Sequence, residues 1–204
     1  MHNDWKGTGI SQDTTLSWYR ENAIQYAEET RNSLVLDALW EFLSRMKAGG
    51  TILDYGSGSG RDSAYFLDKG FSVDSLDGSA EMKAQAERLF GIKVKLSSFL
   101  SLEEKEKYDG IWAQASILHL EEHDLRVALT LIERALKRDG VFYSSFRKGE
   151  EDGYEKGRWY TNMTERRFLS FLPASLYVEK IWESQDVRPG VNKTWLSIIC
   201  RKKS

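Results

Sequence analysis

The chain has 204 residues, a formal net charge of −2 and a hydrophobic fraction of 41%, which is typical of one soluble globular domain with a substantial core. The near-neutral charge argues against a nucleic-acid partner, because phosphate binding needs a basic surface. No stretch reaches the length of a membrane span, and residues 1–5 lack the charged-then-apolar order of a signal peptide, so we expect no membrane partner and a cytoplasmic location.

Two helices are expected at the start of the chain. Apolar residues recur at helical spacing over 16–30, where Trp18 and Ile24 stand among polar residues, and again over 33–46. Gly49-Gly50 then ends the second helix, because glycine commonly follows a helix C-terminus. The first strand is therefore expected directly after residue 50.

From residue 51 onward, strand and helix patterns alternate. The expected strands are 51–55, 71–77, 92–97, 108–115 and 140–146. The expected helices are 60–69, 79–90 and 121–137. This alternation is typical of a parallel sheet with helices on both faces.

The last third of the chain changes character. Residues 148–157 are polar and rich in glycine, too irregular for a helix or a strand. Because a long loop inside a compact domain is usually a lid or a binding loop, we predict a lid-like loop over 148–163. A short helix is expected from Thr164 to Leu172, with Thr164 as its N-cap.

Two expected strands close the chain as a hairpin. Residues 176–187 and 194–201 have strand patterns, and Arg188-Pro189-Gly190 between them indicates a turn. The single cysteine, Cys200, excludes an internal disulfide, favours a reducing compartment and is expected to be a buried strand residue rather than a nucleophile. The predicted fold is α/β, a doubly wound, mostly parallel seven-stranded sheet of Rossmann-like type with an antiparallel C-terminal hairpin, in a single domain over 1–204.

The most informative segment is the loop after the first strand, Asp54-Tyr-Gly-Ser-Gly-Ser-Gly-Arg61. Missing Cβ atoms at its glycines allow a ligand to approach the backbone closely. The third glycine of the dinucleotide motif G-x-G-x-x-G would fall on Arg61. A cofactor without a pyrophosphate does not need that glycine, so the sequence favours S-adenosylmethionine over NAD.

Acidic residues at two strand ends are candidate cofactor ligands. Asp77 ends the second strand, where a carboxylate accepts hydrogen bonds from ribose hydroxyls; a helix N-terminal acid is the alternative, and Asp74 is the competing residue. Asp54 is placed to bind an amino group, or to act as a turn residue. Arg61 is either a partner for a cofactor carboxylate or a solvated surface residue.

Several motifs in order resemble those of class I S-adenosylmethionine-dependent methyltransferases. They are Asp54–Arg61, Asp77, Tyr108–His119 and Leu136–Val141, and the match extends from about residue 18 to residue 202. The chain is most similar to small bacterial members labelled type 11 or tellurite-resistance-like. Departures at residues 55, 57 and 137–140 remove no cofactor contact, because the loop acts mainly through its backbone.

The resemblance implies a cofactor site partly covered by the N-terminal helices of residues 1–48. The cofactor contacts that it implies or agrees with are Tyr19, Tyr26, Asp54, Gly56, Ser57, Gly58, Arg61, Asp77, Gly78, Ser98, Phe99 and Ala113. Ser98 and Phe99 would flank adenine, and Ala113 would face the cofactor. For Phe99, Tyr19 and Tyr26, ordinary core packing explains the pattern equally well.

His119 is the candidate catalytic base, because it follows the fourth strand beside the expected methyl group and titrates near neutrality. The alternative is a histidine that caps or packs the next helix. Side chains expected to ring the acceptor are Arg147, Arg158, Asp186, Arg188 and Trp195, and the arginines suggest an anionic acceptor such as a carboxylate. Three scattered histidines and one cysteine predict no metal site.

The predicted function is methyl transfer from S-adenosylmethionine to nitrogen or oxygen of a small molecule. A binding domain without turnover, acting as a sensor or partner subunit, is one alternative. A methyltransferase for RNA or protein is another, although Gln114-Ala-Ser replaces the signature of adenine-N6 enzymes after the fourth strand. We expect a monomer or homodimer, and the sequence does not identify the acceptor.

Overall fold

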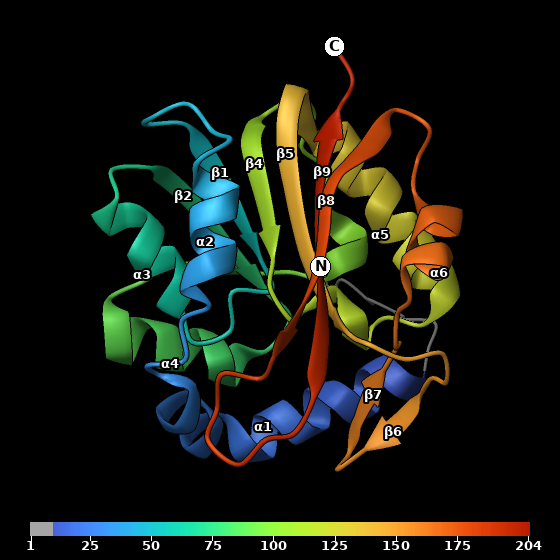
Figure 1. Cartoon of the computed structure of the whole chain (residues 1–204). Coiled ribbons are helices and arrows are strands. Elements are labelled where there is room, and N and C mark those ends of the chain that lie inside the picture. The colour runs from blue at the N-terminus through green and yellow to red at the C-terminus, as the bar shows by residue number, and fades with distance from the viewer. Residues whose placement is uncertain (1–9) are drawn as a thin grey trace, which may run out of the picture.

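Within residues 10–204, which the computed structural model describes, the central sheet has seven strands in the order β3-β2-β1-β4-β5-β9-β8 (Figure 1). These are β1 (Thr51–Tyr55), β2 (Ser72–Asp77), β3 (Val94–Leu96), β4 (Tyr108–Ala113), β5 (Leu136–Arg147), β8 (Leu176–Gln185) and β9 (Thr194–Lys202). Strands β1 to β5 pair in parallel, whereas β9 is antiparallel to β5 and β8. This sheet confirms the predicted fold class. The expectation about a signal sequence concerns residues outside the described range.

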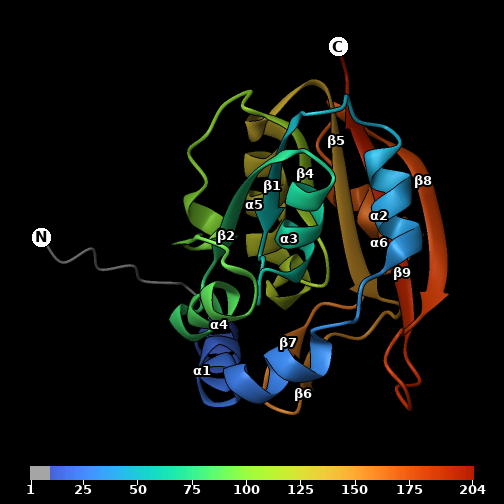
Figure 2. The ribbon, with the colours of Figure 1, turned by 90° about the vertical axis from the view of Figure 1, so that its left-hand side faces the viewer.

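Helices cover both faces of the sheet and one end of its strands. They are α1 (Ile10–Thr30), α2 (Leu36–Leu43), α3 (Arg61–Asp68), α4 (Ala80–Phe90), α5 (Glu122–Ala135) and α6 (Glu165–Phe171), with short 3-10 helices η1 (Phe99–Ser101) and η2 (Ile117–His119). The helix α1 crosses beneath the ends of the strands, beside α4 (Figure 2). No helix of residues 10–204 has the length and apolarity needed to cross a bilayer.

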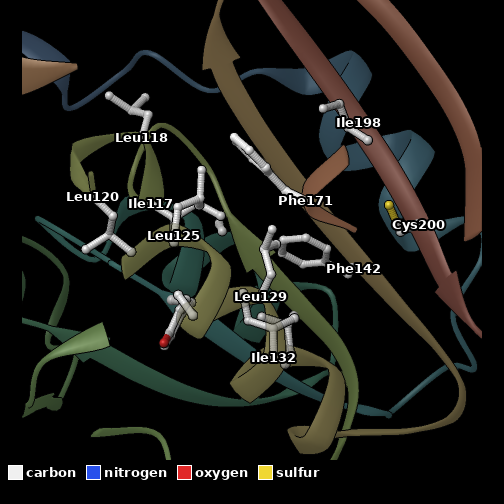
Figure 3. Close-up of a cluster of buried hydrophobic side chains, with 14 of the residues drawn as sticks. Ile117, Leu118, Leu120, Leu125, Leu129, Ile132, Phe142, Phe171, Ile198 and Cys200 are labelled. Atoms are coloured by element: carbon white, nitrogen blue, oxygen red, sulfur yellow. The ribbon is translucent and has the colours of Figure 1, made fainter. Parts of the chain in front are cut away.

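Strand alternation divides the core into two layers. In β5, Phe142 joins Leu129 and Ile132 of α5 on one face, as Figure 3 shows, while Tyr143 packs with Trp112 on the face covered by α2 and α3. The rings of Trp112 and Tyr143 are stacked at 4.0 Å between centroids. Burial of such apolar surface on both faces accounts for the continuous apolar runs that predicted these strands.

The expectation that residues 148–157 are too irregular for a strand is wrong, because residues 153–160 form a second, two-stranded sheet, whereas the lid-like role of 148–163 stays a prediction. Strands β6 (Gly153–Glu155) and β7 (Arg158–Tyr160) form an antiparallel hairpin. Its two-residue turn places Lys156 at φ 50° and Gly157 at φ 78°, the conformation of a type I′ turn. Strands of three residues are too short to show a period in the sequence, and Lys156 gives no turn signal.

Other boundaries moved by a few residues. The helix α1 begins before the predicted residue 16, and α2 is shorter than 33–46. The strand β5 begins at Leu136 rather than 140, where its register against β4 shifts. Cys200 is a free, fully buried residue of β9, which confirms its predicted structural role. That all of 1–204 forms one domain stays a prediction.

Gly56 in the glycine loop and Gly70 after α3 form a matched pair that separates the cost of a steric clash from the cost of backbone strain. An alanine Cβ at Gly56 would lie 2.4 Å from Ser116 Cβ, whereas at Gly70 it would meet nothing within 4 Å, and both residues have left-handed backbones, at φ +87° and +83°. We expect Gly70→Ala to lower the free energy of unfolding by about 1–2 kcal/mol and Gly56→Ala to lower it by clearly more. Urea denaturation of both variants measures the difference; equal losses would contradict the packing argument.

Candidate active site

A cavity of about 880 Å³ opens at the carboxyl ends of the parallel strands, where ligands bind in open α/β sheets. Every residue predicted for the site except Ala113 lines this cavity. These are Tyr19, Tyr26, Asp54, Gly56, Ser57, Gly58, Arg61, Asp77, Gly78, Ser98, Phe99, His119, Arg147, Arg158, Asp186, Arg188 and Trp195. The fold therefore brings together residues that are distant in sequence.

Ala113 is the exception, and its predicted contact with the cofactor stays a prediction. Strand alternation turns its fully buried side chain toward the α5 layer of the core. The next residues after β4, Gln114, Ala115 and Ser116, line the cavity instead. Within this turn Ala115 adopts φ 49°, and its N–H donates to Ser145 Oγ at 2.8 Å.

The Asp77 carboxylate holds the glycine loop in place. Its Oδ2 accepts from the N–H of Gly58 at 2.8 Å, and its Oδ1 accepts from the N–H of Ser79 at the same distance. Burial raises the pKa of Asp77 above its ordinary value, and these backbone N–H groups oppose that rise. A carboxylate has further lone pairs, so Asp77 can still accept bonds from ligand hydroxyls. The competitor Asp74 instead binds Tyr108 and Lys107.

Asp54 lies buried beside a second acid and is held by serine hydroxyls. Ser63 Oγ donates to Asp54 Oδ2 at 2.6 Å and lies 2.7 Å from Ser75 Oγ. Burial, reinforced by the negative charge of Asp62, raises the pKa of Asp54 to about 8. Among the described residues no cation forms an ion pair with Asp54, so a cationic ligand group would be the partner that stabilises its charged form.

Arg61 is not a solvated surface residue. Its guanidinium makes two hydrogen bonds to Asp62, at 2.7 and 3.1 Å, and a third to the carbonyl of Thr30 at 3.1 Å. The Trp112 indole N–H donates to the same Asp62 carboxylate at 2.9 Å. Arg61 therefore reaches the cavity with its charge already balanced, and it links α3 to the end of α1.

The residues around the glycine loop fit an adenosine-containing cofactor with a charged tail. Ser57 Oγ is buried with no hydrogen-bond partner in the described part of the chain. A Cβ at Gly58 would meet only Met82 Cε, at 3.6 Å, so this glycine, unlike Gly56, leaves room on the cavity side. With Asp77 and the Phe99 ring nearby, the donor set suits a ribose, an aromatic base and an amino-acid tail.

Both ring nitrogens of His119 are engaged. Its Nδ1 lies 2.6 Å from the carbonyl oxygen of Trp159, and because a carbonyl only accepts, Nδ1 carries the proton. Its Nε2 therefore accepts from Tyr19 Oη at 3.2 Å. Burial, aided by the charges of Arg158 and Arg147, lowers the pKa of His119 to about 3, so the imidazole is neutral.

The three predicted arginines differ in how their charges are balanced. Arg188 makes two hydrogen bonds to Asp186, at 2.8 and 2.6 Å, and Trp195 donates to the same carboxylate. Arg147 pairs with Glu155 at 2.8 Å. Arg158 forms no ion pair with any carboxylate of residues 10–204, and its guanidinium lies 4.0 Å from the Trp18 ring centroid.

Gln114 is a lining residue whose role the sequence did not predict. Its Oε1 accepts from Tyr143 Oη at 2.7 Å and from Ser145 Oγ at 3.1 Å. Because Ser145 Oγ also accepts from Ala115 N–H, its own proton is directed to Gln114. The Gln114 amide N–H groups are thereby left for a ligand. Its position after β4 was the one available signal. Within the described residues, no cluster of three or more His, Cys, Asp or Glu is arranged to hold a metal ion.

Comparison with known proteins agrees with this geometry. Residues 52–140 match a family described as "Methyltransferase domain". A comparison with curated proteins finds no match. The 1,6-didemethyltoxoflavin-N1-methyltransferase of Burkholderia thailandensis, solved with 1,6-didemethyltoxoflavin and S-adenosylhomocysteine, is 21% identical at a TM-score of 0.77, covering 95% of this chain and 89% of that chain.

Two further solved structures have the same fold. A TehB-like methyltransferase of Corynebacterium glutamicum is 24% identical, with a TM-score of 0.69, and covers 90% of this chain and 100% of that chain. A chain from the complex of the Haloferax volcanii Trm112 methyltransferase activator is 19% identical, with a TM-score of 0.71 and coverages of 93% and 97%. At these identities the likeness shows the fold alone.

The raised pKa of Asp54 predicts a stability that depends on pH. The folded pKa of about 8 exceeds the ordinary value of 3.8, so the folded state binds the proton more tightly between these values. Stability is therefore lost as pH rises through this window, by up to about 1.4 kcal/mol per pH unit. Chemical denaturation across the window should show this slope in the wild type relative to Asp54→Asn, and parallel curves would contradict it.

Proposed function

We propose that this chain is a class I S-adenosylmethionine-dependent methyltransferase that transfers methyl to nitrogen or oxygen of a small molecule carrying an anionic group. The match of residues 52–140 to a methyltransferase family supports the enzyme class, and the S-adenosylhomocysteine bound in the Burkholderia structure supports the cofactor. The observation that carries the acceptor proposal is Arg158, which faces the same cavity as the glycine loop with no carboxylate partner among the described residues. A half-buried cation of this kind is stabilised by a ligand anion.

In this proposal residues at the ends of β1, β2 and β3 would hold the cofactor. Asp77 would accept from its ribose hydroxyls, Asp54 would bind its ammonium group, and Ser98 and Phe99 would border its adenine. When bound, the cofactor supplies an activated methyl group, so the work of the protein is to align the acceptor and exclude water. Tyr19 and Tyr26 from α1 line the same cavity.

The ion pairs in the cavity wall indicate which arginine would bind the anionic group of the acceptor. Arg188 and Asp186 neutralise each other and are assigned to the cavity wall, together with Trp195. Arg147 is partly committed to Glu155, so Arg158 is the principal anion ligand. The small heteroaromatic ligand named for the Burkholderia enzyme supports an acceptor of similar size here. We also assign the enzyme to the cytoplasm, where the free thiol of Cys200 stays reduced.

Cofactor choice can be tested by thermal shift. S-adenosylhomocysteine should raise the melting temperature and NAD should not, because binding to the folded state stabilises it. Asp77→Asn should weaken S-adenosylhomocysteine binding about tenfold or more, since a charged hydrogen bond contributes about 1.5–3 kcal/mol. A shift with NAD alone would overturn the proposed function.

The role of Arg158 can be tested with a panel of small nucleophiles that carry or lack an anionic group, by measuring S-adenosylhomocysteine formation. Arg158→Leu should raise the KM of anionic acceptors by about tenfold or more and leave cofactor affinity unchanged, while Arg158→Lys should recover part of the loss. Arg166→Leu, an exposed arginine of α6, serves as the control. An unchanged KM in Arg158→Leu would contradict this assignment.

A further inference from the structure

We propose that Tyr19, and not His119, contacts the acceptor, and that the Tyr19 hydroxyl passes the acceptor's proton to His119 Nε2. The acceptor group is then a protic N–H or O–H of an aromatic or heteroaromatic ring, and not an aprotic nucleophile. This inference rests on the proposed function and adds the route by which the proton leaves.

The hydrogen bonds of His119 leave no nitrogen for an acceptor. Its Nδ1 proton is donated to the carbonyl of Trp159, and its one lone pair, on Nε2, is occupied by the Tyr19 hydroxyl. A direct proton transfer to His119 would first require Tyr19 to leave. Tyr19 itself lines the cavity. Its oxygen accepts a hydrogen bond from Arg158 and keeps a second lone pair that can accept a proton from a ligand.

Packing fixes the Tyr19 ring in this position. It meets the rings of Trp18, Tyr26 and His119 edge-on, at centroid distances of 5.2, 5.4 and 5.9 Å. The Arg158 guanidinium lies 5.9 Å from its centroid. A planar acceptor therefore finds aromatic walls, a cation and a hydroxyl within one region of the cavity, which is the basis for the stated acceptor class.

The proton transfer balances as a two-proton relay. The acceptor heteroatom forms its bond to the methyl carbon and loses its proton to Tyr19 Oη. At the same time the phenolic proton of Tyr19 moves to His119 Nε2, which leaves Tyr19 neutral and His119 an imidazolium that still donates from Nδ1 to Trp159. The carbon–sulfur bond breaks with its electron pair on sulfur, so a positive charge is lost there as one is gained on His119.

Charges around the pair explain why an acceptor anion matters. The titratable groups facing His119 are Tyr19, Tyr160, Arg147 and Arg158. The two arginines disfavour an imidazolium, and an anion bound at Arg158 offsets them, so the pKa of His119 rises when the acceptor binds. Burial and the neighbouring Tyr26 raise the pKa of Tyr19, which keeps the phenol protonated and able to donate.

The first experiment uses 4-hydroxy-3-nitrobenzoate, which carries a carboxylate for Arg158 and a phenol whose own ionisation falls within the assay range, and measures kcat and KM for S-adenosylhomocysteine formation from about pH 6 to 9. For Tyr19→Phe we expect kcat to fall about 100-fold or more at the acidic end. The defect should shrink to a few-fold at the alkaline end, where the phenolate arrives already deprotonated. His119→Asn, which keeps a donor toward Trp159, should behave in the same way.

Two conservative changes outside the cavity are matched controls. Tyr154→Phe alters an exposed phenol of the β6–β7 hairpin, and His123→Gln alters an exposed histidine of α5. Both should match the wild type at every pH. A Tyr19→Phe enzyme as active as the wild type at low pH, or equally impaired at all pH values, would overturn the relay. Wild-type turnover of benzimidazole-5-carboxylate and 4-hydroxy-3-nitrobenzoate at background level would overturn the acceptor class.

A second measurement does not depend on turnover. Long-range ¹H–¹⁵N NMR of histidine-labelled protein saturated with S-adenosylhomocysteine should show His119 as the Nδ1–H tautomer, and Tyr19→Phe should shift its Nε2 resonance. An Nε2–H tautomer of His119, or an Nε2 resonance that stays unchanged in Tyr19→Phe, would refute the relay. Tight S-adenosylhomocysteine binding in the same samples would keep the proposed function intact, whereas loss of binding by the wild type would refute that function instead.

Discussion

The carboxylate of Asp77 is the interaction on which the site depends. Its two oxygens bind the N–H of Gly58 and that of Ser79, so one side chain holds the glycine loop after β1 against the start of α4. Backbone N–H groups of Gly56 and Ser57 bind the carbonyl of Leu76 in the same strand. The loop is thus joined to β2 along its length. These bonds fix where its residues lie at the border of the cavity.

A second buried acid supports the surroundings of this loop. Asp62 binds Arg61 and the Trp112 indole, and Arg61 reaches the last turn of α1. These contacts connect α3, β4 and α1 through charged hydrogen bonds, which are stronger than neutral ones and costly to break when buried. The placement of α1 over the cavity, and of Tyr19 within it, follows from this network and from the aromatic contacts with Arg158.

Ion pairing distinguishes the arginines that stabilise the cavity wall from the one that is available to bind a ligand anion. The Asp186–Arg188 pair and the contact of Glu155 with Arg147 and Lys193 join loops around the cavity. Arg158 sits among aromatic rings instead, which contribute attraction without neutralising the charge. Because aromatic rings leave the charge of Arg158 unneutralised, an anionic group of a ligand can form an ion pair with it.

The sequence alone determined the sheet, the glycine loop and the importance of Asp77, because hydrophobic period, glycine spacing and strand-end acids are local properties of the chain. It did not predict the β6–β7 hairpin, whose strands are too short to show a period, nor the side to which Ala113 points. Tertiary structure decided which arginine is left without a carboxylate and that the Tyr19 hydroxyl occupies the lone pair of His119. Those outcomes depend on contacts between residues 100 or more positions apart, and no local pattern encodes which distant side chains will meet.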